Sequence, residues 1–433
     1  MIITNNQFTT ERCRIITWGD YLLLQLSPGT IEVTEQELLR MKNVLDDVRG
    51  SMLYADFRLQ LADGSWVEQD CIDYQLGSVR DDFDFGHLVM VRSRDFLSCK
   101  TCGEVPESLS YTKWYEVRLM LSLIALPFHL NEYLYTYRPA EVSATSQFDY
   151  VNPRNRSIQQ EYERIFTAYL KDIHAWTDYN LMKSATPLDD NAEVMASVVI
   201  PVYNRVKTVA DAVHSALSQE CSFSFNVIVV DNHSTDGTTQ VLAEIAKHDS
   251  RLVHIIPEET SLKIGGCWNK AVNSEHCGNY IVQLDSDDVY SRNDTLQLMV
   301  DAFTQQDCMA VVGSYRLTDF DLNELPPGII DHREWTAVNG MNNALRINGL
   351  GAPRGFRRDL LRQHPLPNTS YGEDYAAMLR ISREYRIDRI YESLYDCRRW
   401  SGNSDAALSR EKINRNNFYK DSIRSIEISA RKK

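Results

Sequence analysis

An acidic cluster directly follows a short apolar run in the second half of the chain. Asp285, Asp287 and Asp288 come after Tyr280–Leu284, a run typical of a buried strand. Carboxylates placed in this way can bind one hard divalent cation, which proteins often share with the oxygens of a substrate phosphate. Acidic residues also gather in solvated turns and helix caps. The surrounding elements must therefore decide between a site and a turn.

Short β-rich runs alternate with segments of helical period from about residue 196 onward. The predicted strands are Ala196–Pro201, Phe225–Asp231, Leu252–Ile256 and Tyr280–Leu284. Apolar residues at helical spacing predict helices over Val209–Leu217 and Thr238–His248, and a third helix opens at Gly265. This alternation is typical of an α/β domain with a largely parallel sheet.

Three of these strands end in polar segments. The segments are Pro201–Asn204, Asp231–Gly237 and Asp285–Asp288. Ligands of open α/β sheets bind at the carboxyl ends of the strands, and all three segments would lie at that edge. Each segment alone is consistent with a turn, but the three together predict a ligand site.

In these segments the chain resembles the family 2 glycosyltransferases, which adopt the GT-A fold. The matching motifs, in order, are Ser197–Asn204, Val229–Thr238, Leu284–Asp288 and Gly372–Asp374. The resemblance covers about residues 196–400. It implies an α/β fold with a mixed, mostly parallel GT-A sheet. It also implies an enzyme of the hexosyltransferase class that moves a sugar from a nucleotide-diphosphate donor to an acceptor hydroxyl with inversion.

The resemblance implies donor-binding roles for several residues. These are Pro201, Tyr203, Asn204, Asp231, Asp236, Asp285 and Arg398. Asp285 would contact the ribose or a metal ion, and Asp287 would bind Mn²⁺ or Mg²⁺ at the diphosphate. Such a cation neutralises the charge that grows on the departing nucleoside diphosphate. A UDP-sugar is the favoured donor and a glycan or another hydroxyl compound the acceptor. The individual sugar, the acceptor and the third metal ligand stay open.

The resemblance places the catalytic base at the start of a later helix. Asp374, preceded by Glu373, would take the proton from the acceptor hydroxyl. The alternative for this pair is helix capping with a favourable charge at the helix start. Arg398–Trp400 is similar to the end of the Gln-x-x-Arg-Trp signature of processive members, but Asp396 stands at the Gln position. This difference argues against processive synthesis.

The first 150 residues partly repeat the later sequence. Glu132–Arg138 matches Glu392–Arg398 at its Glu, Leu, Tyr and Arg residues. The same alignment places Val117 opposite Asp374, and Leu53–Asp56 opposite the acidic turn, with Tyr54 in place of its first Asp. We therefore predict an inactive, degenerate copy of the acceptor half of a GT-A domain, with chance similarity as the alternative.

Four segments are expected along the chain. They are an α+β domain over residues 1–150, a helical connector and linker over 151–193, the catalytic domain over 194–400 and a helical tail over 401–433. The tail would cover the catalytic domain or form a homodimer. The segment Lys183–Glu193 is polar and predicts the final linker.

Composition and charge narrow the class of protein. The net charge of −14 argues against general nucleic-acid binding, which needs a basic surface. No apolar run approaches the ~20 residues of a membrane span, and the N-terminus has no secretion signal. We expect a cytoplasmic protein with reduced cysteines, and a peripheral position at the inner membrane face is the alternative. Cys99 and Cys102 form the only close cysteine pair, and we expect no structural zinc there because no second ligand pair follows.

Two other functions remain open from the sequence. One is a noncatalytic scaffold that binds nucleotide sugars or glycans. The other is a nucleotidyltransferase, which would be expected to carry a basic, glycine-rich phosphate loop, and Lys263–Gly266 matches such a loop only weakly. Because Asp287 and Asp374 are both present, a glycosyltransferase is the favoured interpretation.

Overall fold

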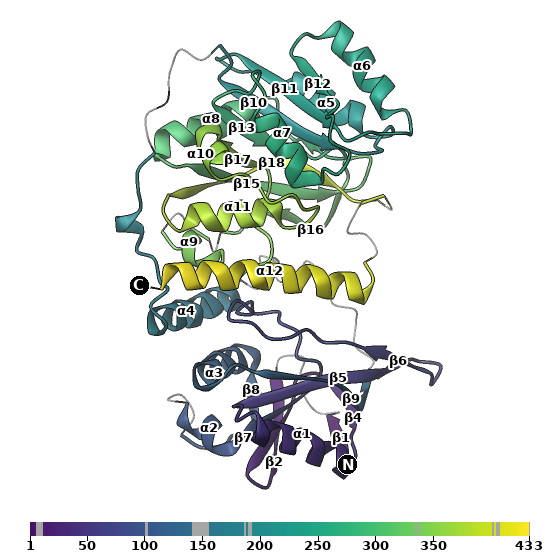
Figure 1. The fold of residues 1–433 in the computed structure, drawn as a ribbon, viewed down its shortest axis with the longest axis vertical. Coiled ribbons are helices and arrows are strands. Elements are labelled where there is room, and N and C mark those ends of the chain that lie inside the picture. Colours follow the sequence, from purple (N-terminus) through teal and green to yellow (C-terminus); the bar gives the residue numbers. More distant parts are fainter. Residues whose placement is uncertain are drawn as a thin grey trace. The chain divides into compact units, whose positions relative to one another are not determined.

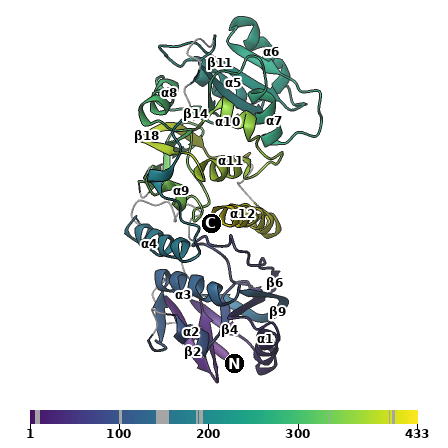
Figure 2. The same cartoon turned by 60° about the vertical axis from the view of Figure 1, so that its left-hand side comes forward.

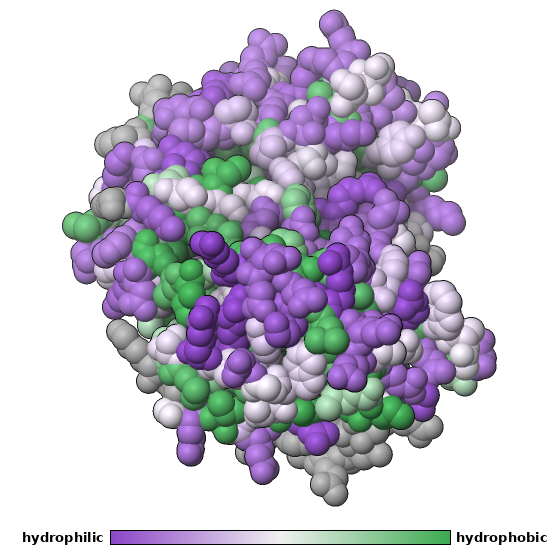
Figure 3. Space-filling model, turned by 60° about the horizontal axis from the view of Figure 1, so that its bottom comes forward, coloured by the Kyte–Doolittle hydropathy of each residue, from purple (hydrophilic) through white to green (hydrophobic). Residues whose placement is uncertain are grey.

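A computed structural model describes most of the chain. The described residues are 1–5, 12–99, 103–140, 156–185, 188, 193–333, 335–336, 338–400, 402–403 and 408–432. Cys102 and most of the expected linker Lys183–Glu193 lie outside them. Within the described ranges, every helix is too short or too polar to cross a membrane. Figure 3 shows one face of the surface, on which hydrophobic and hydrophilic residues are intermixed.

Backbone contacts divide the chain into two units. The N-terminal unit is Met1–Gln147, Ser157–Trp176 and Leu408–Lys433, and the C-terminal unit is Phe148–Arg156 and Thr177–Ala407. The expected connector helix forms α4 (Arg156–Asp172), and the expected tail forms α12 (Arg410–Arg431). Almost all of α4 and the whole of α12 belong to the N-terminal unit, so this unit is assembled from three separate parts of the sequence.

The C-terminal unit has one nine-stranded sheet in the order β12-β11-β10-β13-β17-β15-β18-β14, with β16 paired to β15. Its strands are β10 (Ala196–Val202), β11 (Phe225–Asp231), β12 (Leu252–Ile255), β13 (Tyr280–Gln283), β14 (Val289–Tyr290), β15 (Ala310–Thr318), β16 (Glu324–Ile330), β17 (Arg354–Arg357) and β18 (Ile387–Arg398). Its helices are the 3-10 helix η3 (Tyr179–Leu181), α5 (Val209–Leu217), α6 (Thr238–His248), α7 (Ile264–Val272), α8 (Thr295–Gln306), α9 (Gly340–Asn343), α10 (Arg358–Gln363) and α11 (Glu373–Ser382). The strands and helices expected between residues 196 and 284 are all present.

The sheet of the C-terminal unit is mixed. β12, β11, β10 and β13 are parallel, and so are β15 and β18, whereas β17 is antiparallel to both β13 and β15. Alternate side chains of β10 and β11, such as Val198 and Val227, pack with α5, α6 and α8 on one face. Helix α7 packs with α10 and α11 (Figure 1). This arrangement places the C-terminal ends of β10 and β13 next to the start of α11.

The N-terminal unit also has one nine-stranded sheet, in the order β1-β4-β9-β5-β7-β3-β2-β8, with β6 paired to β5. Its strands are β1 (Ile2–Asn5), β2 (Arg12–Trp18), β3 (Tyr21–Gln25), β4 (Gly29–Glu32), β5 (Met52–Gln60), β6 (Trp66–Gln69), β7 (Leu88–Arg92), β8 (Ser108–Ser110) and β9 (Phe128–Pro139). Its helices besides α4 and α12 are α1 (Glu35–Asp47), α2 (Ser93–Ser98) and α3 (Tyr111–Ile124). Helix α1 lies on the opposite face of the sheet from α2 and α3 (Figure 2).

The N-terminal unit repeats part of the topology of the C-terminal unit. The order β3, β4, α1, β5, β6, β7, α2, α3, β9 corresponds to β13, β14, α8, β15, β16, β17, α10, α11, β18. The strand directions also agree, because β5 is parallel to β9 and antiparallel to β6 and β7, as β15 is to β18, β16 and β17. Beyond β3 the units differ, since antiparallel β2 and β8 stand where the C-terminal unit has parallel β10, β11 and β12. The repeat therefore covers only the second half of the larger domain.

Two hydrogen bonds fix the register of this repeat in its longer helices. The Tyr115 hydroxyl on α3 donates to the carbonyl oxygen of Val79 at 2.6 Å. The Tyr375 hydroxyl on α11 donates to the carbonyl oxygen of Ala344 at the same distance, 2.6 Å. Val79 lies before β7 and Ala344 lies before β17, the corresponding strand, so α3 and α11 align through this pair of tyrosines.

This register changes the counterpart of the predicted catalytic base. The same alignment pairs Ser122 with Ser382, and each hydroxyl donates to the carbonyl three residues earlier in its own helix. Trp114 then takes the place of Asp374. The sequence alignment put Val117 there, which was wrong by about one helical turn.

The acidic turn also has no acidic counterpart in the N-terminal unit. Aligning β3 with β13 through their pairing to β7 and β17 puts Tyr21 opposite Tyr280 and the turn Leu26–Pro28 opposite Asp285–Asp287. Leu53–Asp56, which the sequence alignment placed opposite the acidic turn, lies instead in β5, the counterpart of β15. The N-terminal unit thus lacks both the carboxylates and the base of the larger domain.

A buried ion cluster holds α12 in the N-terminal unit. The Asp421 carboxylate accepts hydrogen bonds from Arg424 at 2.7 Å, from Ser78 at 3.0 Å and from Arg80 at 3.3 Å. The Arg80, Asp421 and Arg424 side chains are almost completely buried. Removal of the anion would take away the carboxylate that both buried guanidinium groups share, although Arg80 keeps Asp82 at 2.8 Å, and loss of one partner of a buried ion pair is strongly destabilising.

We therefore expect Asp421→Ala to lower the free energy of unfolding by about 3 kcal/mol. Chemical denaturation of the full chain measures this change. Glu411→Ala is the matched control, because Glu411 lies on the same helix with an exposed side chain and should change stability by less than about 0.5 kcal/mol. Equal stability of the two variants would show that the cluster contributes little to the fold.

Candidate active site

A cavity of about 290 Å³ opens at the C-terminal ends of β10 and β13. Its lining combines acidic side chains, arginines and one tryptophan. The lining residues are Pro201, Arg205, Ile264, Trp268, Gln283, Asp285, Ser286, Asp287, Asp288, Arg354, Glu373, Asp374, Cys397, Arg399 and Asn403. The acidic turn and the predicted base, about 90 residues apart in sequence, therefore face the same cavity.

Residues of β13 and β18 hold the acidic turn in place. The Asp288 carboxylate accepts hydrogen bonds from the Tyr395 hydroxyl and the Arg398 backbone N–H, both at 2.8 Å. The Asp285 carboxylate accepts from Gln283 Nε2 at 2.9 Å. Burial raises the pKa of Asp285, and the nearby Asp287 and Asp374 carboxylates add to this effect, while Arg354 opposes it. The cavity thus concentrates negative charge that a cation would stabilise.

Asp287 is held more loosely than its neighbours. Its Oδ2 atom accepts from Asn403 Nδ2 at 3.2 Å and from Trp400 Nε1 at 3.4 Å, and it lies 3.8 Å from Arg205 Nε. These distances are long for hydrogen bonds. Asp287 can therefore turn toward a ligand in the cavity at little cost.

The predicted base forms an ion pair inside the cavity. Asp374 Oδ2 lies 2.9 Å from Arg354 Nη1, and its Oδ1 accepts from the Tyr375 backbone N–H at 2.7 Å. Arg354 Nη1 also donates to the Gly351 carbonyl oxygen at 2.9 Å, so the arginine is fixed from two sides. Arg354 and Asp374 line the same cavity as the acidic turn.

Glu373 lies beside Asp374 but in a different environment. Its side chain is buried, and among the described residues its Oε2 atom has no hydrogen-bond partner. Burial, with the Asp374 charge as a second cause, raises the pKa of Glu373 to about 8. Glu373 is therefore mostly protonated at neutral pH in the absence of ligand and can donate a hydrogen bond.

This raised pKa predicts a pH-dependent stability. Below pH 4.5 Glu373 is protonated in both states, whereas between 4.5 and about 8 the unfolded chain loses a proton that the folded protein keeps. Stability must therefore fall as the pH rises through this window. We expect Glu373→Gln, in the presence of a metal chelator, to be more stable than the parent by about 4 kcal/mol at pH 8 and nearly equal to it at pH 4.5. Denaturant unfolding at both pH values measures the difference, and a pH-independent difference would contradict the assignment.

Two of the expected donor-binding residues, Asn204 and Asp236, lie in two loops that are joined to each other. Asn204 Oδ1 accepts from the Thr235 N–H at 2.8 Å, and the Val206 N–H donates to Asp236 Oδ2 at 3.0 Å. Pro201 lines the cavity and Tyr203 is exposed. Asn204 and Asp236 therefore fix the two loops to each other.

Asp231, the next expected donor-binding residue, is buried at the end of β11. Its carboxylate accepts from the Ser234 N–H at 3.0 Å and from the Thr239 hydroxyl at 2.5 Å. Burial would raise its pKa, but hydrogen bonds from His254, Ser234 and Thr239 hold the pKa of Asp231 well below its usual range. Asp231 thus stays ionised over the physiological range.

The two arginines at the end of β18 have different positions. Arg398 is buried, with Nη1 2.8 Å from Asp211 Oδ2 and Nε donating to the Asp287 carbonyl oxygen at 2.6 Å. Arg398 therefore holds the acidic turn in place, through its side chain at Asp287 and through its backbone N–H at Asp288. Arg399 lines the cavity, whereas Arg398, the expected donor-binding residue, is not among the lining residues.

Several lining residues carried no clear signal in the sequence. Arg354 follows a loop that contains glycine and proline. Trp268 lies in an apolar helix, where a tryptophan is expected from packing alone. Gly265 and Gly266 are explained by packing, because a Cβ atom would meet the Pro367 carbonyl oxygen at 2.0 Å or Asn368 Oδ1 at 2.4 Å. These glycines let α7 pack closely on the loop before α11, which removes the reason to assign them to a phosphate loop.

Comparison with known proteins identifies relatives of the C-terminal unit. The family model described as Glycosyl transferase family 2 matches residues 197–364. The chain is 28% identical to the teichuronic acid biosynthesis glycosyltransferase TuaG of Bacillus subtilis over 194 residues, which is 45% of this chain and 74% of TuaG. It is 35% identical to chondroitin synthase of Escherichia coli over 173 residues, which is 35% of this chain but only 24% of that enzyme.

Solved structures that align with part of this chain include nucleotide-sugar complexes. The structure of S. aureus TarS with UDP-GlcNAc aligns over 53% of this chain and 66% of that chain, with 21% identity and a TM-score of 0.43. The mannosyltransferase PcManGT from Pyrobaculum calidifontis, with GDP-Man and Mn²⁺, aligns over 65% of this chain and 85% of that chain, with 16% identity and a TM-score of 0.41.

Proposed function

The chain belongs to glycosyltransferase family 2 and has the expected GT-A fold, and we propose that it is an inverting, metal-assisted transferase that uses a nucleotide-diphosphate sugar. The observation that carries this proposal is the shared cavity of Asp285, Asp287 and Asp374. Two carboxylates at the diphosphate position and one at the acceptor position are the groups that a single displacement requires.

The acidic turn suits a hard divalent cation. Asp285 and Asp287 supply carboxylate oxygens, the ligands that Mg²⁺ and Mn²⁺ prefer. The pKa of Asp285 supports this fit, because burial first and the nearby Asp287 and Asp374 carboxylates second raise it, and a cation would offset both effects. Bound there, the cation would stabilise the negative charge of the leaving nucleoside diphosphate.

Asp374 is the proposed general base. Its carboxylate, oriented by Arg354 and the Tyr375 N–H, would accept the proton of the acceptor hydroxyl as that oxygen attacks the anomeric carbon. Attack from the side opposite to the leaving group inverts the configuration, so an α-linked donor gives a β-linked product. Protonated Glu373 would donate a hydrogen bond to a hydroxyl of either substrate.

Arg205 and Arg399 are the proposed partners of the diphosphate. Both line the cavity beside Asp287, and guanidinium groups form paired hydrogen bonds with phosphate oxygens. The loops of Asn204 and Asp231 would hold the base and ribose, with a UDP-sugar as the donor expected from the family. A hydroxyl of a glycan remains the proposed acceptor and the cytoplasm the proposed location.

Binding and transfer can be tested separately. The purified chain is heated with UDP, GDP and CMP and their common sugar conjugates, with and without Mn²⁺, and any stabilising donor is then tested for sugar release to water or to an oligosaccharide panel. We expect one nucleotide class to stabilise the protein in the presence of Mn²⁺, and slow release of the nucleoside diphosphate. Stabilisation with no turnover on any acceptor would favour the noncatalytic scaffold.

A further inference from the structure

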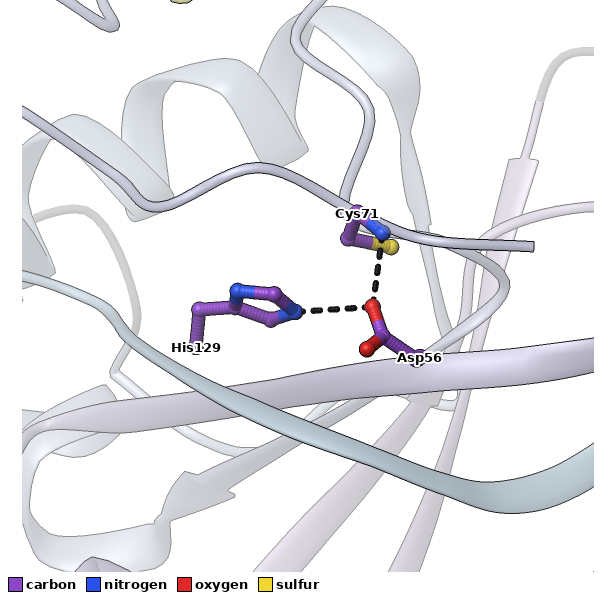
Figure 4. Close-up of side chains that lie close together, drawn as sticks. All are labelled: Asp56, Cys71 and His129. Atoms are coloured by element: carbon purple, nitrogen blue, oxygen red, sulfur yellow. Dashed lines mark hydrogen bonds and ion pairs between the residues drawn. The ribbon is translucent and has the colours of Figure 1, made fainter. Parts of the chain in front are cut away.

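A second group of possible metal ligands lies in the N-terminal unit, outside the proposed active site. Asp56 on β5, His129 on β9 and Cys71 after β6 place a carboxylate oxygen, an imidazole nitrogen and a sulfur within 4.8 Å of one another (Figure 4). Asp56 Oδ1 accepts from the Cys71 backbone N–H at 2.7 Å and lies 2.9 Å from His129 Nε2. Three different ligand types thus converge from three segments of the unit.

The imidazole of His129 is held in one orientation. Its Nδ1 atom lies 2.8 Å from Asp73 Oδ1, and its ring stacks on Tyr54 at 5.0 Å with an interplanar angle of 17°. A carboxylate on the outer nitrogen of a histidine, with the inner nitrogen facing the site, is the usual support of a metal-binding histidine. The side chain of Asp73 is 74% exposed, whereas His129 is 5% exposed and Asp56 is fully buried.

One ligand atom has no partner. Among the described residues, the buried Asp56 Oδ2 atom has no hydrogen-bond donor. An unpaired buried carboxylate oxygen costs free energy that a cation would recover. Arg410 also approaches the cysteine, but its guanidinium group already pairs with Asp84 at 2.8 Å and donates to the Asp70 carbonyl oxygen at 2.9 Å.

Cys71 also lines a solvent-connected cavity of about 470 Å³ in the same unit. The other lining residues are Asp70, Ile72, Asn131, Tyr133, Glu411, Asn414, Arg415 and Phe418. A cation can therefore reach Cys71 from solvent, whereas Asp56 and His129 are not among the residues that line this cavity. The cavity also leaves room for a water molecule or a ligand at a further coordination position.

The repeated topology argues that the fold itself does not require this cluster. By strand register, Asp56 corresponds to Ser314 and His129 to Arg389 in the C-terminal unit. The pairing of β15 with β18 is irregular at Ser314, as that of β5 with β9 is at Asp56. The Ser314 hydroxyl donates to the Ile390 carbonyl oxygen at 2.8 Å there. An uncharged residue is thus sufficient at this position of the shared topology.

We propose that Asp56, Cys71 and His129 bind a Zn²⁺ ion, with Asp73 orienting the histidine and the cavity supplying the fourth coordination position. The combination of sulfur and nitrogen ligands favours zinc over the Mg²⁺ or Mn²⁺ that suits an all-oxygen site. Ligand atoms on one zinc ion lie roughly 3 to 4 Å apart, so the cluster must contract only slightly around the ion.

Metal content and cobalt spectroscopy of the full chain test this proposal. After incubation with zinc and desalting, we expect about one zinc ion per chain in the parent protein, in Cys13→Ser, where another buried cysteine of the unit is changed, and in Asp287→Ala. We expect its loss in Cys71→Ser and His129→Gln. With Co²⁺, the parent should show a thiolate-to-metal absorption band that Cys71→Ser lacks. Because Asp73 is exposed, Asp73→Asn should fold normally and bind zinc about 10-fold more weakly.

Three results would overturn the proposal. The first is a parent protein that retains no zinc and gives no thiolate–cobalt band. The second is equal zinc affinity in the parent and in Asp73→Asn, together with full retention in Cys71→Ser. The third is loss of zinc in Asp287→Ala only, which would place the bound ion at the acidic turn of the other unit.

Discussion

Asp374→Asn is expected to lower kcat by about 10²- to 10⁴-fold, the usual contribution of a general base. The amide retains the shape of the carboxylate but cannot take the proton of the acceptor hydroxyl. It also weakens the ion pair with Arg354, which is 2.9 Å long in the structure. Initial rates at saturating donor and acceptor, once both are identified by the donor panel, measure the effect.

A measurement of donor binding shows whether Asp374→Asn has lost only the catalytic step or also the structure of the site. Asp374 is assigned to the acceptor side, so the thermal stabilisation that Asp374→Asn gains from the nucleotide and Mn²⁺ should stay close to that of the parent. Asp294→Asn, at the half-exposed start of α8, is the matched control and should keep the parental rate. If Asp374→Asn keeps kcat within a few-fold, the residue only caps α11, and the base must be sought elsewhere.

The parallel half of the sheet could be predicted from sequence because its signals are local. The run Phe225–Asp231 is apolar and β-branched over its whole length, and Thr238–His248 places Val241, Leu242 and Ile245 on one helical face; both elements have the predicted bounds. Asp231 and Asp285 could be assigned to one edge because sheet topology brings the ends of parallel strands together, whereas Asp374, at the start of α11, was assigned only through the family resemblance.

The remaining features depend on contacts between distant residues. Arg354 becomes a site residue only because β17 runs antiparallel to β13, and the pKa of Glu373 depends on how deeply α11 is buried. The repeat was recognisable from β9 and β18, but its helices were misaligned because Val117 and Trp114 are equally plausible from spacing alone. The hydrogen bond of Tyr115, which links α3 to residue 79, settles that register and has no sequence signature.

Asp287→Ala is expected to abolish the Mn²⁺-dependent stabilisation by the nucleotide. A ligand at ~100 times its dissociation constant adds about 2.7 kcal/mol of stability, and this increment should disappear in the variant. The physical reason is the loss of one of the carboxylates that would bind the cation beside the diphosphate. Thermal unfolding with matched nucleotide and Mn²⁺ concentrations measures the loss.

The ligand-free stability of the variant shows whether this loss reflects the site or the fold. The contacts of Asp287 Oδ2 with Asn403 and Trp400 are 3.2 and 3.4 Å long, so removing them should cost less than about 1 kcal/mol. Asp288→Asn provides the contrast, because Asp288 is buried and binds Tyr395 and the Arg398 backbone, and its substitution should destabilise the ligand-free protein more strongly. Undiminished stabilisation of Asp287→Ala by nucleotide and Mn²⁺ would show that the cation is held by other residues. A parent protein that responds to no nucleotide would instead favour a scaffold that has kept the fold and lost the donor.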